Sequence, residues 1–470
     1  MPLARASSDF AHLTIRETAR LLRARKLSSL ELANEALARI ERLDPSLNAF
    51  ITITADLARS QARAADRELR AGKVRGLLHG IPITIKDNYW TRGVRTTAGS
   101  PILADFVPAA DSAVAARLAE AGVVLLGKTN LNEFAYGIHG LNPHYGEVHN
   151  PWLLDRTTGG SSSGSAAALA SGIGFGSVGT DTGGSLRIPA SFCGIVGFKP
   201  TYGLVSVDRI VPLAASLDHA GPLARTVEDV SILFEAIRGA YPRLVHQKRR
   251  ASEAGKQPRL KLGWPKNYFF DLVDAEVQTA IKRAVKLLES IGARTENVSL
   301  PHLDESVDAS TNVGLAEASS YHTSQGYFPK RAAEYGEDVR KRLELGLHVS
   351  AVDYIAAAHV RAELTHDYDR AFESVDAIVA PATTCTAPRL GELQLEIGGQ
   401  KIPLRDAVVN MNRPANFTGH PAISIPCGFS LAGLPIGLQL IGPRWGDAKL
   451  LAIARAYQQA TDWHKRRPAL

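Results

Sequence analysis

The sequence predicts an α/β protein with a partly parallel sheet, and two segments carry this prediction. GLLHGIPITIKDN places isoleucines at every second position, Ile81, Ile83 and Ile85, which is the period of a strand. A helix-like segment over 111–122 and the apolar run VVLLG follow in strand–helix–strand order. A second unit of this kind covers 260–300. Strands that alternate with helices along a chain are typical of α/β folds.

The remaining elements follow from local patterns. The first seventy residues are expected to be helical, because capping-box patterns at 14–17 (T-x-x-E) and 28–31 (S-x-x-E) precede apolar residues at helical spacing. The charged stretch over 245–259 is the best candidate for a surface connection between two halves. Helices are again expected over 305–375, and the runs AISIPCGF and GLPIGLQLIG predict two strands. At 470 residues, length alone allows two or three domains or one large α/β domain.

Net charge, cysteine content and the length of apolar runs limit which classes of protein and which partners are expected. The chain has a net charge of +7, and the basic clusters at 248–250 and 465–467 lack interleaved aromatic residues, so we expect solvated surface and no nucleic acid partner. Cys193, Cys385 and Cys427 form no CxxC pair, which argues against a disulfide scaffold or a cysteine zinc site. The N-terminal residues lack the apolar core of a secretory signal, and no apolar run is long enough to span a membrane. We therefore expect a cytoplasmic protein with no membrane partner.

The serine-rich stretch TTGGSSSGSAAALASG, residues 157–172, allows several interpretations. A flexible linker is disfavoured because the core-type sequence IGFGSVGTDTGGS follows at once. A phosphate-binding loop needs GxxxxGK[ST], and the sequence has no lysine between Lys128 and Lys199. Residues 160–164 match the G-x-S-x-G nucleophile elbow with Ser162 at its centre, but the preceding NPWLLDRTTGG does not have the pattern of a buried strand.

A fourth interpretation makes this stretch a wall of an active site. TDTGGSLRIP places a second glycine-flanked serine, Ser185, after a glycine-rich strand. Consecutive small residues let several backbone N–H groups surround one point, as an oxyanion hole requires. A serine at that point can attack a carbonyl carbon whose oxygen those groups hold. The nearest upstream base is Lys86, on the opposite face of its strand from the isoleucines.

These segments resemble the amidase signature family. The resemblance is carried by GIPITIKDN, GGSSSGSAAALASG and GTDTGGSLRIPASFCGIVGFKPTYG, with further matches in GKTNLNEFAYG, SLDHAGPLARTVEDV and NFTGHPAISIPCGFSLAGLPIGLQLIG. It runs from about residue 14 to about residue 460 and implies one domain over 1–470, an α/β fold with a mixed, mostly parallel central sheet surrounded by helices. The expected parts are N-terminal helices over 1–70, a catalytic core over 77–230 and a variable helical segment over 300–375 near the substrate site.

The resemblance also implies the site residues. The family's lysine falls on Lys86, its bridging serine in a cis peptide falls on Ser161, and its nucleophile falls on Ser185. The family's oxyanion hole and acyl pocket fall on the N–H groups of Thr182, Gly183, Gly184 and Ser185, and on the loop of Tyr136, Gly137 and Ile138. The family commonly has glycine where this chain has Ser163, which adds a hydroxyl to the pocket. No metal and no cofactor are expected.

The chemistry of such a triad is physically coherent. A serine hydroxyl is a poor nucleophile until a nearby base removes its proton. Lysine is that base only when it is neutral, and burial achieves this by disfavouring the ammonium form. Ser161 would relay a proton between Ser185 and Lys86, and water would then hydrolyse the acyl-enzyme.

Other polar residues are expected to have structural roles. His139, His144 and His149 recur every five residues, which raises the hypothesis of a zinc site. Glycine and proline interrupt the segment and no HExxH occurs, so loop histidines with ordinary partners are favoured over metal ligands. Arg187 is expected to pair with Asp181 rather than to bind a substrate carboxylate.

Three functions are compatible with this pattern. The first is a hydrolase that cleaves the carbonyl C–N bond of small-molecule amides, including aryl amides or carbamates, as a monomer or homodimer. The alternative is the glutaminase A subunit of a tRNA-dependent amidotransferase. The third, a catalytically dead binding module, is disfavoured by the intact Lys86, Ser161 and Ser185. Two segments separate the first function from the glutaminase A subunit. This chain has EFAYGIH where the A subunit usually has EFAMGSS, and it has EASSYHTSQGYF where the A subunit usually has ASSNLxRYDGxRYG. Both differences favour the first function.

Overall fold

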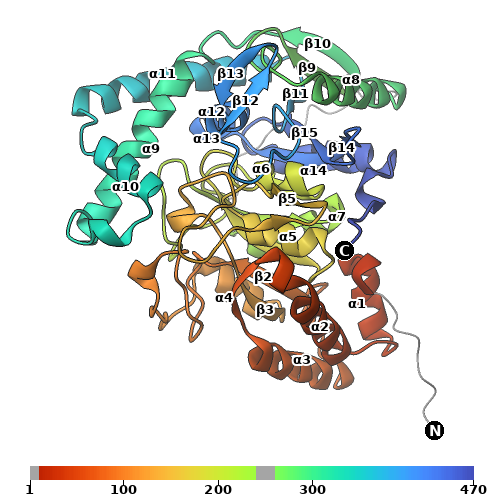
Figure 1. Cartoon of the computed structure of the whole chain (residues 1–470). Helices are drawn as coiled ribbons and strands as arrows, with labels where there is room; N and C mark the ends of the chain where they lie inside the picture. The colour runs from red at the N-terminus through yellow and green to blue at the C-terminus, as the bar shows by residue number, and fades with distance from the viewer. Residues whose placement is uncertain (1–9, 240–259) are drawn as a thin grey trace.

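A large mixed sheet forms the centre of the molecule (Figure 1). The computed structural model describes residues 10–239 and 260–470. The sheet has eleven strands in the order β1-β3-β2-β6-β8-β7-β14-β15-β11-β9-β10. These strands are β1 (Phe50–Ile53), β2 (Pro82–Lys86), β3 (Val124–Thr129), β6 (Gly176–Asp181), β7 (Val196–Lys199), β8 (His219–Ala224), β9 (Lys261–Pro265), β10 (Arg294–Val298), β11 (Ala377–Pro381), β14 (Ala422–Phe429) and β15 (Pro435–Ile441).

Parallel pairing occurs in two blocks of this sheet. In the first block β2 lies parallel to both β3 and β6, and in the second β9 lies parallel to both β10 and β11. The six other neighbouring pairs in the sheet are antiparallel. Both strand–helix–strand units predicted from the sequence are confirmed, because each contributes the two strands of a parallel pair. Two small hairpins, β4 (His149–Asn150) with β5 (Leu153–Thr157) and β12 (Gln394–Ile397) with β13 (Gln400–Pro403), stand apart from the sheet.

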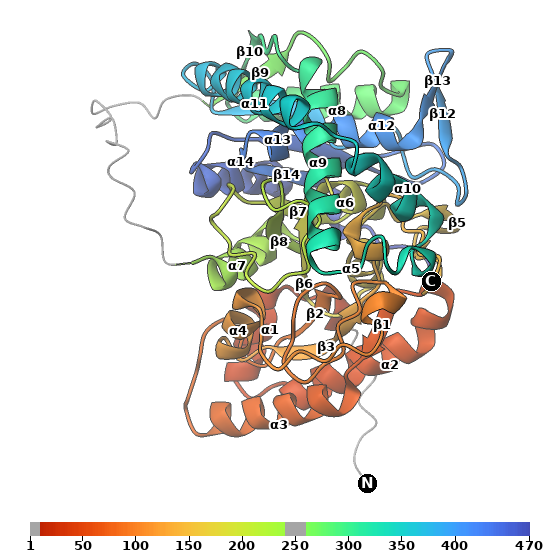
Figure 2. The ribbon, with the colours of Figure 1, turned by 90° about the vertical axis from the view of Figure 1, so that its left-hand side faces the viewer.

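Helices surround the sheet, as expected for this α/β class (Figures 1 and 2). The view of Figure 2 shows α9 running vertically down the middle of this face, with α10 beside it and α11 near its upper part. The helices of the described residues are α1 (Ile15–Arg23), α2 (Ser29–Leu47), α3 (Ala55–Arg70), α4 (Ala113–Glu120), α5 (Ser163–Ala170), α6 (Arg187–Cys193), α7 (Val227–Ile237), α8 (Ala275–Ser290), α9 (Glu305–Ser324), α10 (Glu337–Gly346), α11 (Ala351–Ala371), α12 (Leu404–Asn410), α13 (Arg413–Phe417) and α14 (Asp447–Gln459).

The N-terminal helices begin where the sequence predicts. The Thr14 and Ser28 hydroxyls accept hydrogen bonds from the backbone N–H groups of the glutamates three residues later, at 3.2 and 3.1 Å, and both capping boxes are complete. The structure adds strand β1 between α2 and α3, which the expectation of helices alone did not include. β1 has only four residues and pairs antiparallel with β3 at the edge of the sheet, so it is too short for a clear periodic pattern.

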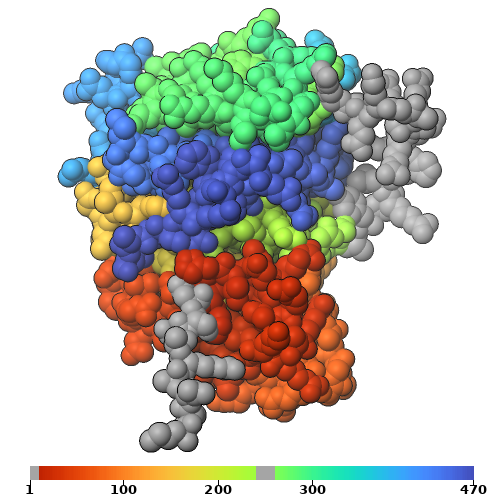
Figure 3. Space-filling view, turned by 90° about the vertical axis from the view of Figure 1, so that its right-hand side faces the viewer, coloured from red at the N-terminus to blue at the C-terminus, as the bar shows by residue number. Residues whose placement is uncertain are grey.

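Both halves of the chain contribute to one domain. In Figure 3 the C-terminal residues, in blue, form a band between the N-terminal residues at the bottom and the green segment at the top. The sheet order explains this arrangement, because the hairpin β14–β15 pairs with β7 on one side and with β11 on the other. The connection predicted over 245–259, which includes the basic cluster 248–250, lies outside the described residues.

The structure bears on two predictions from composition, which concern disulfide bonds and membrane-spanning segments. Cys193, Cys385 and Cys427 are free thiols and are buried. Among the helices that the structure describes, none is long and apolar enough to cross a bilayer. The cytoplasmic location stays a prediction.

Candidate active site

The serine-rich stretch is part of the core. Every residue from 158 to 170 is buried, so the linker interpretation is wrong. A side chain could not replace Gly164, because a Cβ there would lie 2.1 Å from the carbonyl oxygen of Ala49. The nucleophile elbow also lacks its buried strand, since the preceding β5 is largely exposed and lies outside the central sheet. The Ser162 hydroxyl instead donates to the backbone carbonyl of Thr180 at 3.3 Å.

Lys86 and Ser161 are in direct contact. Lys86 is the last residue of β2, and its Nζ donates to Ser161 Oγ at 2.8 Å and to Thr180 Oγ1 at 2.7 Å. The peptide bond between Gly160 and Ser161 is cis. Because β2 and β6 are parallel neighbours, Thr180 near the end of β6 comes alongside the end of β2. All three side chains of this contact are buried.

The environment of Lys86 favours its neutral form. Burial lowers the pKa of Lys86 from its ordinary value of 10.5 to about 7, although the negative charges of Asp181 and Asp218 act in the opposite direction. Its hydrogen bonds go to hydroxyl oxygens, which accept from an amine in either protonation state. A lysine of this kind holds a substantial neutral population near pH 7, which is the requirement for a general base.

Ser185 lies in a tight turn between β6 and α6. Gly184 has a φ of +122°, a conformation that favours glycine, and a Cβ there would lie 2.7 Å from Asn412 Cβ. The Gly184 N–H donates to Asp181 Oδ1 at 2.7 Å, so this donor already has a protein partner. Within the described residues, the N–H groups of Thr182, Gly183 and Ser185 have no such partner. The turn therefore presents three backbone donors next to a serine hydroxyl.

The two serine segments lie side by side. The backbone N–H of Ser162 donates to the carbonyl oxygen of Ser185 at 3.3 Å, which fixes the cis-peptide segment against the turn. The hydroxyl of Ser163 lies 3.5 Å from the carbonyl oxygen of Ser161, so it faces the backbone of its own segment. Lys86 thus lies at the end of β2, Ser161 just before α5, and Ser185 in the turn that follows β6, the parallel neighbour of β2.

Arg187 has the structural role that the sequence predicts. Its Nε and Nη2 donate to the two carboxylate oxygens of Asp181 at 3.0 and 2.9 Å, and it donates further to Gln439 and Asn416. Both members of the pair are fully buried. Burial alone would raise the pKa of Asp181, but the charge and hydrogen bonds of Arg187 hold it well below its usual value. Asp181 in turn accepts from the N–H groups of Gly184 and Leu186, so the pair holds the Ser185 turn in place.

A narrow cavity of about 60 Å³ opens beside Ser185. The loop residues Tyr136, Gly137 and Ile138 line it, together with Thr182 and Gly183. Ser185 and five of the residues assigned beside it from the sequence therefore share one cavity, whereas Lys86, Ser161 and Gly184 do not line it. Most of its other lining residues come from α9, α10 and the segment 405–413. They include Arg342, Arg405 and Arg413, which no sequence pattern singled out.

Two of the three histidines of the zinc hypothesis have separate partners. His144 Nε2 lies 3.1 Å from Glu133 Oε1, and His149 Nδ1 lies 2.8 Å from the carbonyl oxygen of Leu154. Burial, followed by the positive charge of Arg342, lowers the pKa of His139 to about 4. The described part of the chain contains no group of three or more His, Cys, Asp or Glu side chains arranged to hold a metal ion.

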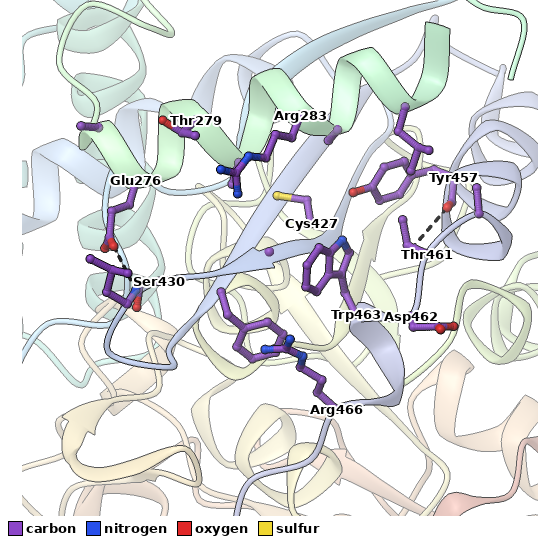
Figure 4. Close-up of a pocket in the computed structure, with 18 residues that line it drawn as sticks. Glu276, Thr279, Arg283, Cys427, Ser430, Tyr457, Thr461, Asp462, Trp463 and Arg466 are labelled. Carbon is purple, nitrogen blue, oxygen red and sulfur yellow. Dashed lines mark hydrogen bonds between the residues drawn. The ribbon is translucent and has the colours of Figure 1, made fainter. Parts of the chain in front are cut away.

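A larger hollow of about 830 Å³ lies away from the serine segments (Figure 4). In Figure 4, Arg283 enters it from α8, and Trp463 and Arg466 enter it from the C-terminal segment. Its lining includes Cys427, but burial raises the pKa of that thiol far above its usual value. No activated nucleophile lines this hollow, so the candidate active site is the cavity beside Ser185.

Comparisons with known proteins agree with this geometry. The sequence model of the family described as Amidase matches residues 31–451. A relative from Chromohalobacter salexigens, named as the A subunit of glutamyl-tRNA(Gln) amidotransferase, is 42% identical over 97% of this chain and 98% of its own. A solved structure titled "Crystal structure of amidase" is 36% identical, has a TM-score of 0.87 and covers 95% of this chain and 99% of its own. The solved A subunit of glutamyl-tRNA(Gln) amidotransferase from Thermotoga maritima is also 36% identical, with a TM-score of 0.77 and coverage of 97% and 96%.

These names correct the expectation about partners. The sequence analysis predicted a small-molecule substrate, no nucleic acid partner and a monomer or homodimer. Relatives that match almost the whole chain are named as one subunit of an amidotransferase, and glutamyl-tRNA(Gln) is part of that name. The expectation was wrong because it rested on the charge distribution of this chain, and one component of such an assembly can act without a basic surface of its own.

Proposed function

Because the chain belongs to the Amidase family, we propose that it hydrolyses the carbonyl C–N bond of amides through an acyl-enzyme on Ser185. The observation that carries this proposal is the buried contact between Lys86 Nζ and Ser161 Oγ, beside the turn that holds Ser185. A neutral amine, a hydroxyl relay and a nucleophile with unpaired backbone donors are the parts that acyl transfer requires.

The proposed reaction begins with proton transfer. Ser185 Oγ forms a bond to the amide carbonyl carbon while its proton passes to Ser161 Oγ, and the Ser161 proton passes to neutral Lys86. The negative charge that develops on the carbonyl oxygen is stabilised by N–H groups of the Ser185 turn. The C–N bond then breaks as the leaving nitrogen receives a proton by the reverse path. Water attacks the Ser185 ester by the same relay and releases the carboxylic acid.

The first candidate for the amide is glutamine, with this chain as the glutaminase A subunit of an amidotransferase. This is supported by relatives of 39–42% identity over 97–98% of the chain. A second candidate is a different amide, including aryl amides or carbamates. Tyr136 and Ile138 of the segment EFAYGIH support it, because they line the cavity and differ from the residues that the glutaminase A subunit usually has at these positions. The TM-score of 0.87 to a solved amidase also supports it.

Ammonia and amine release from a panel of amides tests the proposal. Glutamine, aliphatic amides, nitroanilides and carbamates would be incubated with the purified chain, with hydroxylamine present to intercept the acyl-enzyme as a hydroxamate. We expect hydroxamate from at least one amide and none from a Ser185→Ala variant. Turnover without hydroxamate, at an unchanged rate in the Ser185→Ala variant, would overturn the acyl-enzyme. Release from glutamine alone favours the first candidate, and release from the other amides favours the second.

A further inference from the structure

Three arginines converge on the cavity that holds Ser185. Arg342 comes from α10, Arg405 from α12 and Arg413 from the start of α13, and all three line the cavity together with Ser185. The guanidinium of Arg342 lies over the ring of Tyr136 at 5.0 Å from its centre. Repulsion from Arg405 is among the causes that lower the pKa of both Arg342 and Arg413, so the three cations are within electrostatic range of one another.

Arg413 is the most informative of the three. Its Nη1 donates to Thr311 Oγ1 at 2.6 Å and to the carbonyl oxygen of Val307 at 3.4 Å, and both acceptors are neutral. None of the ion pairs found among the described residues includes Arg413. Burial, followed by repulsion from Arg405, lowers the pKa of Arg413 to about 10. A buried cation without a carboxylate partner is costly unless an anion reaches it.

Arg413 also lies close to the nucleophile turn. A Cβ placed on Gly183 would be 3.9 Å from Arg413 Nε, so the guanidinium faces the backbone that presents Ser185. An acyl group attached to Ser185 needs only a short chain to bring a second functional group to Arg413. The acceptor Thr311 lines the same cavity.

The carboxylates near the other two arginines lie outside the cavity. Arg342 pairs with Asp338 at 2.6 Å and Arg405 is 4.0 Å from Asp406, and both aspartate side chains are more than half exposed, at 65% and 52%. The lining of the cavity contains no Asp and no Glu. The cavity therefore has an excess of positive charge on its inner side, and it has no carboxylate that could receive an ammonium group.

We propose that these arginines select an amide whose acyl chain ends in a carboxylate and carries no ammonium group, that is, a monoamide of a short dicarboxylic acid. The proposal rests on the proposed amide hydrolysis at Ser185. The scissile carbonyl lies at the Ser185 turn and the carboxylate lies against Arg413, with Arg405 and Arg342 adding to the positive potential. Glutamine satisfies the carboxylate requirement, but its ammonium group has no acidic partner in the cavity.

Three amides that differ by one group each test the charge preference. Glutaramate is glutamine without its ammonium group, and butanamide also lacks the carboxylate. We expect kcat/KM to be highest for glutaramate and lower by about 10- to 100-fold for butanamide, the usual range for losing a hydrogen bond to a charged group. Glutamine should lie below glutaramate. A higher kcat/KM for glutamine or for butanamide than for glutaramate would overturn the proposal.

Variants and direct binding separate this inference from the proposed function. The affinity for glutarate, measured by calorimetry, should weaken at least tenfold in Arg413→Met and in the less buried Arg405→Met. It should be partly restored in Arg413→Lys. It should stay unchanged in Arg340→Met, a surface control on the same helix as Arg342. Butanamide turnover should change less than glutaramate turnover in the same variants. Glutarate binding without hydrolysis of any amide would overturn the proposed function alone. Amide hydrolysis with no glutarate binding, or with equal binding in all variants, would overturn the inference alone.

Discussion

Lys86 Nζ lies 2.8 Å from Ser161 Oγ, and this contact joins the end of one strand to the cis-peptide segment 75 residues later. The second partner of the amine is the hydroxyl of Thr180, at 2.7 Å. Neither partner is a carboxylate, so the attraction that would hold Lys86 in its charged form comes only from Asp181 and Asp218 at longer range. The role proposed for Lys86 therefore depends on its protonation state.

Replacing the amine should remove most of the activity. We expect Lys86→Ala to lower kcat by about 10²- to 10⁴-fold, the usual contribution of general acid–base catalysis. Lys282→Ala, at an exposed position of α8, is the matched control and should behave as the unaltered enzyme. Steady-state kinetics with the best amide of the panel provides the measurement. Full activity in Lys86→Ala would exclude the amine as the base.

The rate should increase with pH around neutrality. The base must be neutral, and the pKa of Lys86 is lowered to about 7, so the active fraction is small at pH 5 and nearly complete at pH 9. We expect kcat/KM to increase through a single titration with its midpoint near pH 7, because kcat/KM reports the free enzyme. A profile that falls over this range would mean that the ammonium form is the active one.

Two serines compete for the role of nucleophile, and their variants should separate them. Ser185→Ala should abolish turnover and labelling by a fluorophosphonate probe, since it removes the hydroxyl beside the unpaired N–H groups. Ser162→Ala should still be labelled, because its hydroxyl donates to the backbone of Thr180. Mass spectrometry of the labelled peptide identifies the serine. The opposite pattern would favour the nucleophile elbow.

The buried Arg187–Asp181 pair predicts a large effect on stability. Arg187→Met leaves the Asp181 carboxylate buried without its cation, which typically costs about 3–5 kcal/mol of unfolding free energy. The matched control is Arg444→Met, whose surface pair with Asp369 should contribute about 1 kcal/mol or less. Urea unfolding followed by circular dichroism gives both values. Equal losses in the two variants would show that burial of the pair has no special energetic role.

Local sequence patterns predicted many of the elements, but they gave no order for the strands of the sheet. The alternating isoleucines of β2 and the capping boxes of α1 and α2 are confirmed, because these signals depend on residues close together in the chain. The insertion of β14 and β15 between β7 and β11 had no such signal. Apolar strands such as AISIPCGF can pair with many partners, and the choice depends on packing over the whole sheet.

The site shows the same division. Ser185 and Lys86 are candidates from the residues alone, through the glycine-flanked serine and the end of an alternating strand, and the family resemblance adds Ser161. The arginine cluster could not be found in this way, because Arg342 and Arg413 are ordinary helix residues in separate segments. Only the packing of α10 and α13 around the Ser185 turn brings them to one cavity. Their shared feature, a positive charge without an acidic partner inside the cavity, depends on the tertiary structure and cannot be recognised in the sequence.

The proposed catalytic residues and the three cavity arginines occupy separate stretches of the chain, and this separation affects how such proteins diversify. The proposed reactive groups all lie at or before residue 185, and the three arginines all lie after residue 340. Mutations in the later stretch can therefore alter which molecules are accepted while the proton relay is inherited unchanged. A combinatorial library at positions 342, 405 and 413 would yield variants with new substrate preferences and unchanged catalytic residues. Chimeras joined between the two stretches would combine the reactivity of one parent with the preference of another.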